Sequence, residues 1–171
     1  MQISFSNLET FIKEGAGFLA KGPIALVFAE DEAELDTTLR HHQQLGFHRV
    51  IGFMPSAFSL AADLVDTVVR VNYDVRGEEA LSKAVNAVIH VAQGQWLYYC
   101  FNAEYLFYPF CETRVVGEML AFDTEERRDA MLTYVVDLYA GDLDSYPSAV
   151  SLYSAFIDRS GYYALARPDA A

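Results

Sequence analysis

Apolar and polar positions along the chain alternate between short, fully apolar runs and longer segments with helical spacing. Apolar runs of this length are typical of strands that are buried on both faces of a sheet. They predict strands at Ile24–Ala29, Val50–Phe53, Thr67–Val71 and Gln95–Phe101. A further strand is expected at Met131–Tyr139, where leucine, tyrosine and valine are concentrated.

Between these runs, apolar residues recur every three or four positions, as they do on one face of an amphipathic helix. This spacing predicts helices over Asn7–Leu19, Glu32–Leu45, Glu78–Ala92 and Arg114–Phe122, and one or two helical turns over Phe58–Leu64. In the second of these helices, Glu32, Glu34 and Asp36 are expected in the first turns, where the helix dipole favours acids. Gly46 is expected to end that helix.

The alternation of strands and helices is typical of α/β domains with a largely parallel sheet. We therefore expect a three-layer α/β sandwich, in which helices cover both faces of a mostly parallel sheet. A chain of 171 residues is long enough for one domain with a substantial core but short for two. Residues 1–171 are accordingly interpreted as a single α/β domain, whose ligands should bind beyond the carboxyl ends of the strands.

Composition and charge narrow the classes of partner. An apolar fraction of 53% excludes intrinsic disorder, and a net charge of −12 argues against a nucleic-acid partner. No export signal opens the sequence, and polar residues interrupt the longest uncharged stretch, Ala84–Ala103. We therefore expect a cytoplasmic protein with no transmembrane segment, in which Cys100 and Cys111 are buried, reduced thiols.

An acidic group, Glu30-Asp31-Glu32, directly follows the first predicted strand. Carboxylates at the end of a strand lie where α/β proteins build their binding sites. The same group is equally consistent with the solvated start of a helix, and the sequence leaves both interpretations open.

The most informative segment is Gln95–Cys111, in which Asn102 and Glu104 are the only strongly polar pair among many aromatic residues. In an extended strand, residues two positions apart point to the same side. Oxygen ligands at this spacing suit Mg²⁺ or Mn²⁺. The alternative is that both side chains satisfy backbone groups at the end of a buried central strand.

The four histidines have no metal-ligand spacing. His41 and His42 are adjacent, so on a helix their side chains diverge by about 100° and cannot readily chelate one ion. They are expected to be ordinary surface or helix-capping histidines.

Several short motifs together resemble the nucleotide-sugar-binding half of glycosyltransferase family 2-like proteins of the GT-A fold. Glu30-Asp31 stands where those proteins have an Asn-Glu pair, and His42 precedes Leu45-Gly46-Phe47 as a histidine does there. Gly94 and Trp96 precede Asn102-Ala103-Glu104-Tyr105-Leu106-Phe107, which looks like a variant of the family's Asp-x-Asp motif. The resemblance covers about residues 24–139.

The resemblance implies transfer of a sugar from a nucleoside-diphosphate sugar to an unknown acceptor hydroxyl. It places Glu30, Asp31, Asn102 and Glu104 at the nucleotide sugar, with Asn102 and Glu104 also holding Mn²⁺ or Mg²⁺. Asn102 replaces an aspartate of the family, which leaves less negative charge for such a metal.

The resemblance leaves the catalytic base unassigned, with Asp137, Asp142 and Asp144 as conceivable candidates. It also leaves open that the chain is the N-terminal part of a longer glycosyltransferase. Because Asn102 departs from the motif, the alternative is a noncatalytic module on the same fold that binds a sugar, a nucleotide or another protein.

Overall fold

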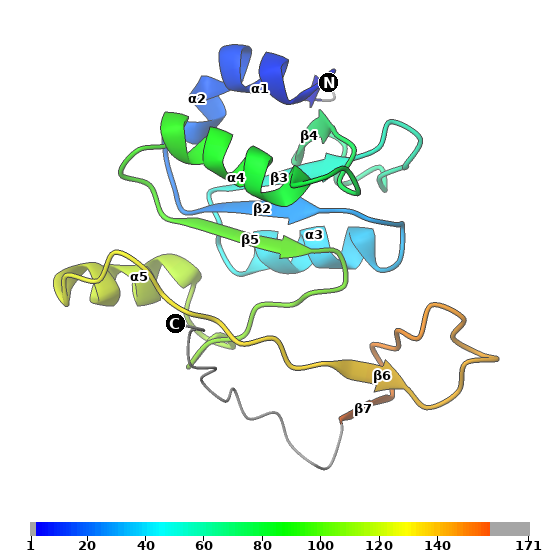
Figure 1. Ribbon diagram of the computed structural model, residues 1–171. Coiled ribbons are helices and arrows are strands. Elements are labelled where there is room, and N and C mark those ends of the chain that lie inside the picture. Colours follow the sequence, from blue (N-terminus) through cyan, green and yellow to red (C-terminus); the bar gives the residue numbers. More distant parts are fainter. Residues whose placement is uncertain (1–2, 158–171) are drawn as a thin grey trace, which may run out of the picture. The chain divides into compact units, whose positions relative to one another are not determined.

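The computed structural model describes residues 3–157, and the chain divides into two compact units, Met1–Arg127 and Arg128–Ala171. The first unit contains a parallel sheet of five strands in the order β1-β4-β3-β2-β5 (Figure 1). Its strands are β1 (Ser4–Phe5), β2 (Ile24–Phe28), β3 (Arg49–Met54), β4 (Val69–Asn72) and β5 (Leu97–Phe101). The prediction of an α/β fold with a parallel sheet is confirmed.

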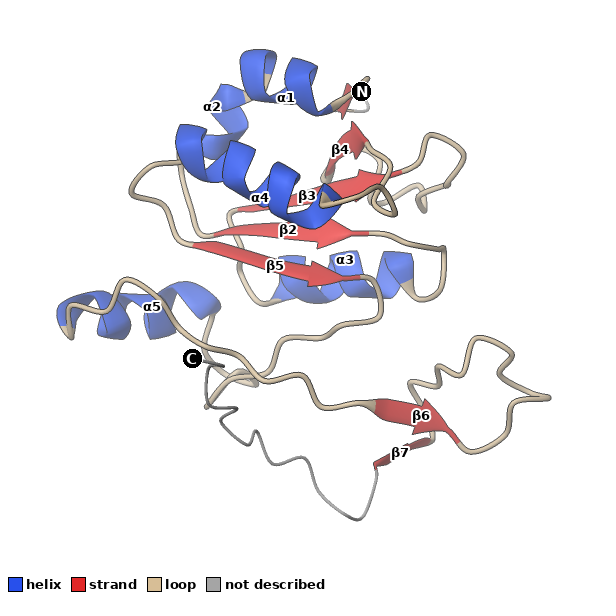
Figure 2. Cartoon of the chain, in the orientation of Figure 1, coloured by secondary structure: helices blue, strands red, loops and turns tan. Residues whose placement is uncertain are grey.

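Helices lie on both faces of this sheet (Figure 2). The helices are α1 (Leu8–Glu14), α2 (Ala16–Leu19), α3 (Leu35–Gln44), α4 (Ala80–Val91) and α5 (Val116–Glu125). Alternate residues of β2 contribute to two separate cores, as the period of a strand requires. Ile24 and Phe28 belong to the core with α1, α2 and α4, whereas Ala25 and Val27 belong to the core with α3 and α5.

The direction in which strands are added reverses next to β2. From β2 the chain proceeds through α3 to β3 and then to β4, on one side of β2. It then passes through α4 to β5, which pairs with the other side of β2. Ligands of open α/β sheets bind at such a reversal, beyond the carboxyl ends of the two strands.

Two predicted elements of the first unit differ from the structure. The helix expected over residues 7–19 is divided at Gly15, where an added Cβ would lie 2.6 Å from the Phe11 ring. Residues 58–61 are irregular and residues 62–64 form a turn, where one or two helical turns were predicted. The strand β5, which the structural alternative for Asn102 and Glu104 treated as central, lies at the edge of the five-stranded sheet.

The start of α3 also differs from the prediction. Glu32 and Glu34 precede α3, because Glu34 has a left-handed conformation with φ of 51°. Of the three acids, only Asp36 lies in the first turn of the helix.

In the second unit, the prediction of a strand at Met131–Tyr139 is largely wrong. Only β6 (Leu138–Ala140) is a strand there, and it pairs antiparallel with β7 (Ala155–Ile157). Leu132, Tyr134 and Val135 are exposed. An apolar, β-branched segment has strand propensity, but it becomes a strand only where another strand pairs with it.

Within the described residues, no helix is both long enough and apolar enough to cross a membrane.

Candidate functional site

The reversal of strand order brings together the two loops that the sequence analysis selected. Glu30 and Asp31 follow β2, and Asn102 and Glu104 follow β5. Phe28 and Phe101 are paired in the sheet register, and the backbone N–H of Asn102 donates to the carbonyl of Phe28 over 3.0 Å. Open α/β sheets have their crevice at such a reversal, and on this topological ground we refer to the region formed by residues 30–34 and 102–104 as the β2/β5 crevice.

The Asn102 side chain joins the two loops of the crevice. Its Oδ1 accepts the backbone N–H of Glu30 at 2.9 Å. Its Nδ2 donates to Oδ1 of Asp31 at 2.7 Å and to the carbonyl of Ala33 at 3.0 Å. An amide suits this position because it supplies both an acceptor and donors, whereas an ionised carboxylate could not donate to Asp31.

Glu104 is turned toward its own strand. The strand ends at Phe101, and Ala103 adopts a left-handed conformation with φ of 61°. The alternation of an extended strand, on which the sequence analysis relied, therefore does not continue through residues 102–104. Oε2 of Glu104 instead accepts the backbone N–H of Phe101 at 2.7 Å.

These contacts decide whether Asn102 and Glu104 fit a shared divalent cation. The Asn102 oxygen and one Glu104 oxygen each accept a backbone N–H, as in the structural alternative considered for this pair. Among the described residues, no group of three or more His, Cys, Asp and Glu side chains could hold a metal. The donor set does not fit a metal held jointly by Asn102 and Glu104, and we derive no step through one.

Arg76 contacts the crevice and was missed by the sequence analysis. It lies between β4 and α4, and its Nη2 donates to the carbonyl of Glu30 at 2.7 Å. This bond brings an exposed positive charge to the loop that follows β2. The sequence shows Arg76 only as a basic residue in a strand-to-helix connection. That feature does not distinguish it from other exposed arginines, so the sequence alone could not have identified it.

Residues of α3 hold the loop that follows β5. Oγ1 of Thr38 accepts the backbone N–H of Ala103 at 2.9 Å. The Thr37 hydroxyl lies 2.8 Å from the Tyr105 hydroxyl and donates to Oε2 of Glu34 at 2.6 Å. The position of the loop relative to β2 is therefore determined by α3 as well as by the sheet.

His42 is completely buried, so the expectation of a surface or capping histidine was wrong for this residue. Its Nδ1 donates to the carbonyl of Thr38 at 2.8 Å, and its ring stacks on Tyr98 with centroids 5.3 Å apart. Its Nε2 lies 3.8 Å from Sγ of Cys100. Desolvation lowers the pKa of His42 to about 4, so the ring is neutral at pH 7.

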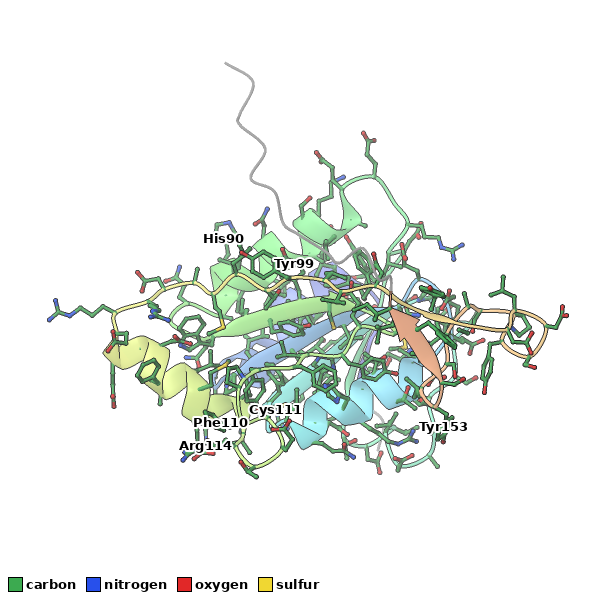
Figure 3. All side chains as sticks on the ribbon, turned by 90° about the horizontal axis from the view of Figure 1, so that it is seen from below. His90, Tyr99, Phe110, Cys111, Arg114 and Tyr153 are labelled. Carbon is green, nitrogen blue, oxygen red and sulfur yellow. The ribbon has the colours of Figure 1, made fainter. Side chains whose placement is uncertain are left out.

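The two cysteines lie in different environments. Cys100 is buried, and burial together with the nearby charge of Glu104 raises its pKa. Cys111 is only partly buried, in the connection between β5 and α5 that also carries Phe110 and Arg114 (Figure 3). Both are free thiols, but the expectation of burial holds fully only for Cys100.

Of the conceivable bases, Asp142 has a well-defined environment within the second unit. Its Oδ1 accepts the backbone N–H of Asp144 at 3.0 Å, and its other oxygen accepts the Ser145 hydroxyl at 2.5 Å. These bonds, that of Ser145 first, lower the pKa of Asp142. A lowered pKa makes a carboxylate a weaker general base, which does not favour Asp142 for that role.

Comparison of the chain with protein-family models, curated proteins and solved structures finds no match.

Proposed function

We propose that the chain binds a nucleoside-diphosphate sugar at the β2/β5 crevice and takes part in transferring the sugar to an acceptor hydroxyl. The observation that carries this proposal is the reversal of strand order next to β2, with Glu30 and Asp31 on one loop and Asn102 and Glu104 on the other. A parallel sheet with this reversal is consistent with a GT-A-like fold, which the sequence motifs independently resemble. The fold alone does not define the reaction, so the argument depends on the crevice.

The side chains of the crevice suit the hydroxyl-bearing part of such a ligand. Of the two carboxylate oxygens of Asp31, only Oδ1 accepts hydrogen bonds from the described residues, and of those of Glu104, only Oε2 does. The second oxygen of each carboxylate is therefore available to accept a sugar or ribose hydroxyl. Arg76, which contacts the crevice through the Glu30 carbonyl, supplies a positive charge for the phosphates.

In the proposed reaction, the acceptor oxygen attacks the anomeric carbon and the bond to the nucleoside diphosphate breaks. The acceptor proton goes to a general base, which we leave unassigned. Arg76 stabilises the negative charge that develops on the departing diphosphate. Glu30 and Asp31 orient the donor on its nucleoside side.

A second candidate function is favoured by the contacts of Asn102. Because both ends of its amide are occupied by the other loop, Asn102 supports the crevice instead of contacting a ligand. A noncatalytic module that binds the nucleotide sugar without turnover would have this arrangement. The two candidates share the binding step and differ only in the release of nucleoside diphosphate.

Calorimetric titration of UDP and GDP into the purified chain, with and without Mn²⁺, tests the shared step. We expect Asp31→Asn and Arg76→Gln to weaken binding at least tenfold. Glu14→Ala removes an exposed carboxylate on α1 and serves as the matched control. A folded wild-type chain that binds neither nucleotide under either condition contradicts the proposal.

Release of UDP or GDP from the corresponding nucleotide sugars separates the two candidates. Turnover that Arg76→Gln reduces supports a transferase. Binding with no release, in the presence of a panel of sugar acceptors, supports the noncatalytic module.

A further inference from the structure

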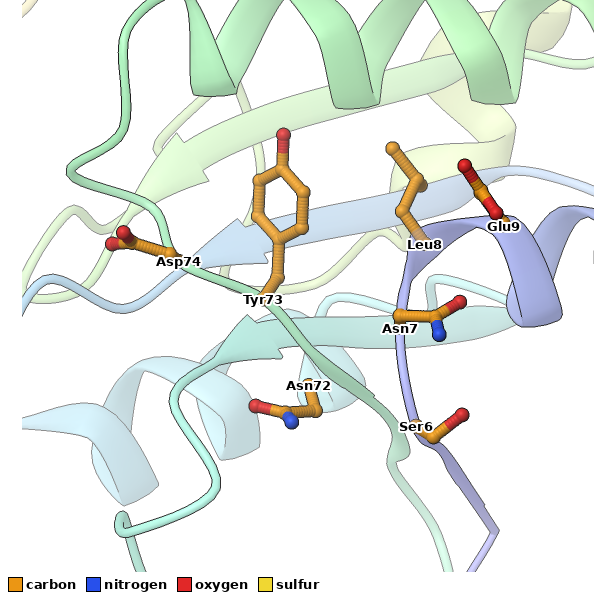
Figure 4. Close-up of a pocket in the computed structure, with 7 residues that line it drawn as sticks. All are labelled: Ser6, Asn7, Leu8, Glu9, Asn72, Tyr73 and Asp74. Atoms are coloured by element: carbon orange, nitrogen blue, oxygen red, sulfur yellow. The ribbon is translucent and has the colours of Figure 1, made fainter.

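An open hollow lies at the carboxyl ends of β1 and β4, on the far side of β3 from the β2/β5 crevice (Figure 4). Its volume is about 640 Å³, and it is widely open to solvent. The lining residues come from the β1–α1 connection, the first turn of α1 and the end of β4, and they are Ser6, Asn7, Leu8, Glu9, Asn72, Tyr73 and Asp74.

The walls of the hollow are held in place by contacts that leave its interior free. Oδ1 of Asn7 caps α1 by accepting the backbone N–H of Thr10 at 2.8 Å. The Tyr73 hydroxyl donates to the carbonyl of Ala80 at 2.8 Å, and its ring packs edge-on against Phe53. The hollow is therefore formed before any ligand arrives, which reduces the entropic cost of binding.

Several polar groups of the lining are available to a ligand. Within residues 3–157, neither the Asn72 amide nor the Glu9 carboxylate takes part in a hydrogen bond that the structure records. Asn7 uses only its oxygen, which leaves its NH₂ group to donate. Asp74 accepts the backbone N–H of Arg76 through Oδ1 at 3.1 Å, which leaves Oδ2 to accept.

The negative charge of the lining residues favours neutral ligands over anions. Glu9 and Asp74 are acidic, and none of the seven lining residues is basic. Phosphates and other anions would therefore be repelled. A hydroxyl group, in contrast, donates to a carboxylate and accepts from an amide N–H, and this lining offers both. Leu8 and Tyr73 add apolar surface against which the C–H face of a sugar ring can lie.

We propose that this hollow is a binding site for a neutral saccharide, separate from the β2/β5 crevice. Asn72 and Asp74 hydrogen-bond its hydroxyls, and Asn7 and Glu9 provide further polar contacts at the rim. The proposal does not depend on nucleotide binding, because β3 separates β4 from β2 in the sheet.

Saturation-transfer NMR of the full chain with glucose, galactose and N-acetylglucosamine, each at millimolar concentration, tests the site. We expect transfer to at least one of these sugars, a loss of at least threefold in Asn72→Ala and Asp74→Asn, and weaker transfer to glucose 6-phosphate than to glucose. Asn86→Ala, on the exposed face of α4, is the matched control and should leave the signal unchanged.

Addition of UDP distinguishes this site from the crevice. UDP should leave the sugar signal unchanged, and displacement by UDP would assign the sugar to the crevice and overturn the proposal. The proposal is also overturned if none of the three sugars receives saturation, or if Asn72→Ala and Asp74→Asn both retain the full signal. A chain that binds the sugars but neither UDP nor GDP would leave this site standing and contradict only the proposed nucleotide function.

Discussion

Nδ2 of Asn102 donates to Oδ1 of Asp31 over 2.7 Å, a bond between residues 71 positions apart in the chain. The same amide accepts the backbone N–H of Glu30 at 2.9 Å. A single side chain therefore connects the loop after β5 to the loop after β2. The shape of the β2/β5 crevice depends on this connection.

Replacing Asn102 with alanine should destabilise the first unit. The substitution removes the partner of the Glu30 N–H and one of the two hydrogen bonds that Oδ1 of Asp31 accepts. Because these groups are exposed, we expect a loss of about 0.5–1.5 kcal/mol in the free energy of unfolding. Urea denaturation followed by circular dichroism measures it. Asn86→Ala removes an exposed amide that makes no such connection, and an equal loss in that control would contradict the structural role of Asn102.

Asn102→Asp, which brings the motif closer to Asp-x-Asp, should be less stable than the wild type at pH 7. The new carboxylate would face Oδ1 of Asp31, where Nδ2 now lies at 2.7 Å, and the two negative charges repel each other. Repulsion between the two carboxylates raises the pKa of one of them, so acidification protonates it and the difference from the wild type should narrow as the pH falls toward about 4. Thermal unfolding of both proteins at pH 7 and pH 4 tests this, and a difference that widens in acid would contradict it.

The free energy of unfolding should fall with acidification because His42 is buried in its neutral form. Its pKa is about 4 in the folded chain, whereas the ordinary value is 6.5. Between these values the unfolded chain binds the proton and the folded chain does not. The His42 contribution is therefore fully present above pH 6.5, declines as the pH falls and is lost by about pH 4, a change of about 3 kcal/mol.

His42→Leu should remove this part of the pH dependence. Urea denaturation at several pH values compares its slope with that of the wild type. His90→Ala replaces an exposed histidine on α4 (Figure 3) and should retain the wild-type slope. Equal slopes in His42→Leu and the wild type would show that burial of His42 does not cause the effect.

Alanine substitutions at Gly46 and Gly94 separate two causes of destabilisation, the left-handed backbone conformation and a collision of the added Cβ with a neighbouring side chain. Both have positive φ, 85° and 77°, so alanine at either position carries a left-handed penalty of about 1–2 kcal/mol. A Cβ at Gly46 would also lie 2.8 Å from Cβ of Val115, whereas nothing lies within 4 Å at Gly94. Gly46→Ala should therefore be the more destabilising substitution, by chemical denaturation. Adding Val115→Gly, which removes that Cβ, should recover part of the difference relative to Val115→Gly alone, and no recovery would exclude the collision as its cause.

Thiol labelling should distinguish the two cysteines. Cys100 is buried with a raised pKa, so its reactive thiolate is scarce and shielded, whereas Cys111 is partly accessible. Iodoacetamide should label Cys111 in the native chain and Cys100 only after addition of urea, as measured by mass spectrometry. Labelling of both at the same rate in the native chain would contradict the burial of Cys100.

Much of the first unit could be predicted because local pattern and tertiary structure agree there. The run at Ile24–Phe28 is apolar at every position, and such a run is stable only where both faces of a strand are covered. The alternation of such runs with amphipathic helices is typical of α/β domains with a parallel sheet. The acids after β2 and the polar pair after β5 could be selected because both follow predicted strands.

Other features could not be predicted because they depend on contacts distant in sequence. An asparagine two residues before a glutamate has the spacing of a ligand pair, but Ala103 adopts a left-handed conformation and Asn102 finds its partners in residues 30–33. Likewise, the burial of His42 requires Tyr98 and Cys100 on β5. The apolar segment at 131–137 has no pairing strand within the described residues and so is not a strand.

The amino-acid sequence thus determined the identity and order of the main strands and helices, because hydrophobic periodicity acts over neighbouring residues. The tertiary structure decided which polar side chains face a ligand and which support the fold. Asn102 shows the reason. The pairing of β2 with β5 brings the loop after β2 beside Asn102, and that loop supplies hydrogen-bond partners for both the oxygen and the NH₂ group of the amide. The side chain therefore supports the fold.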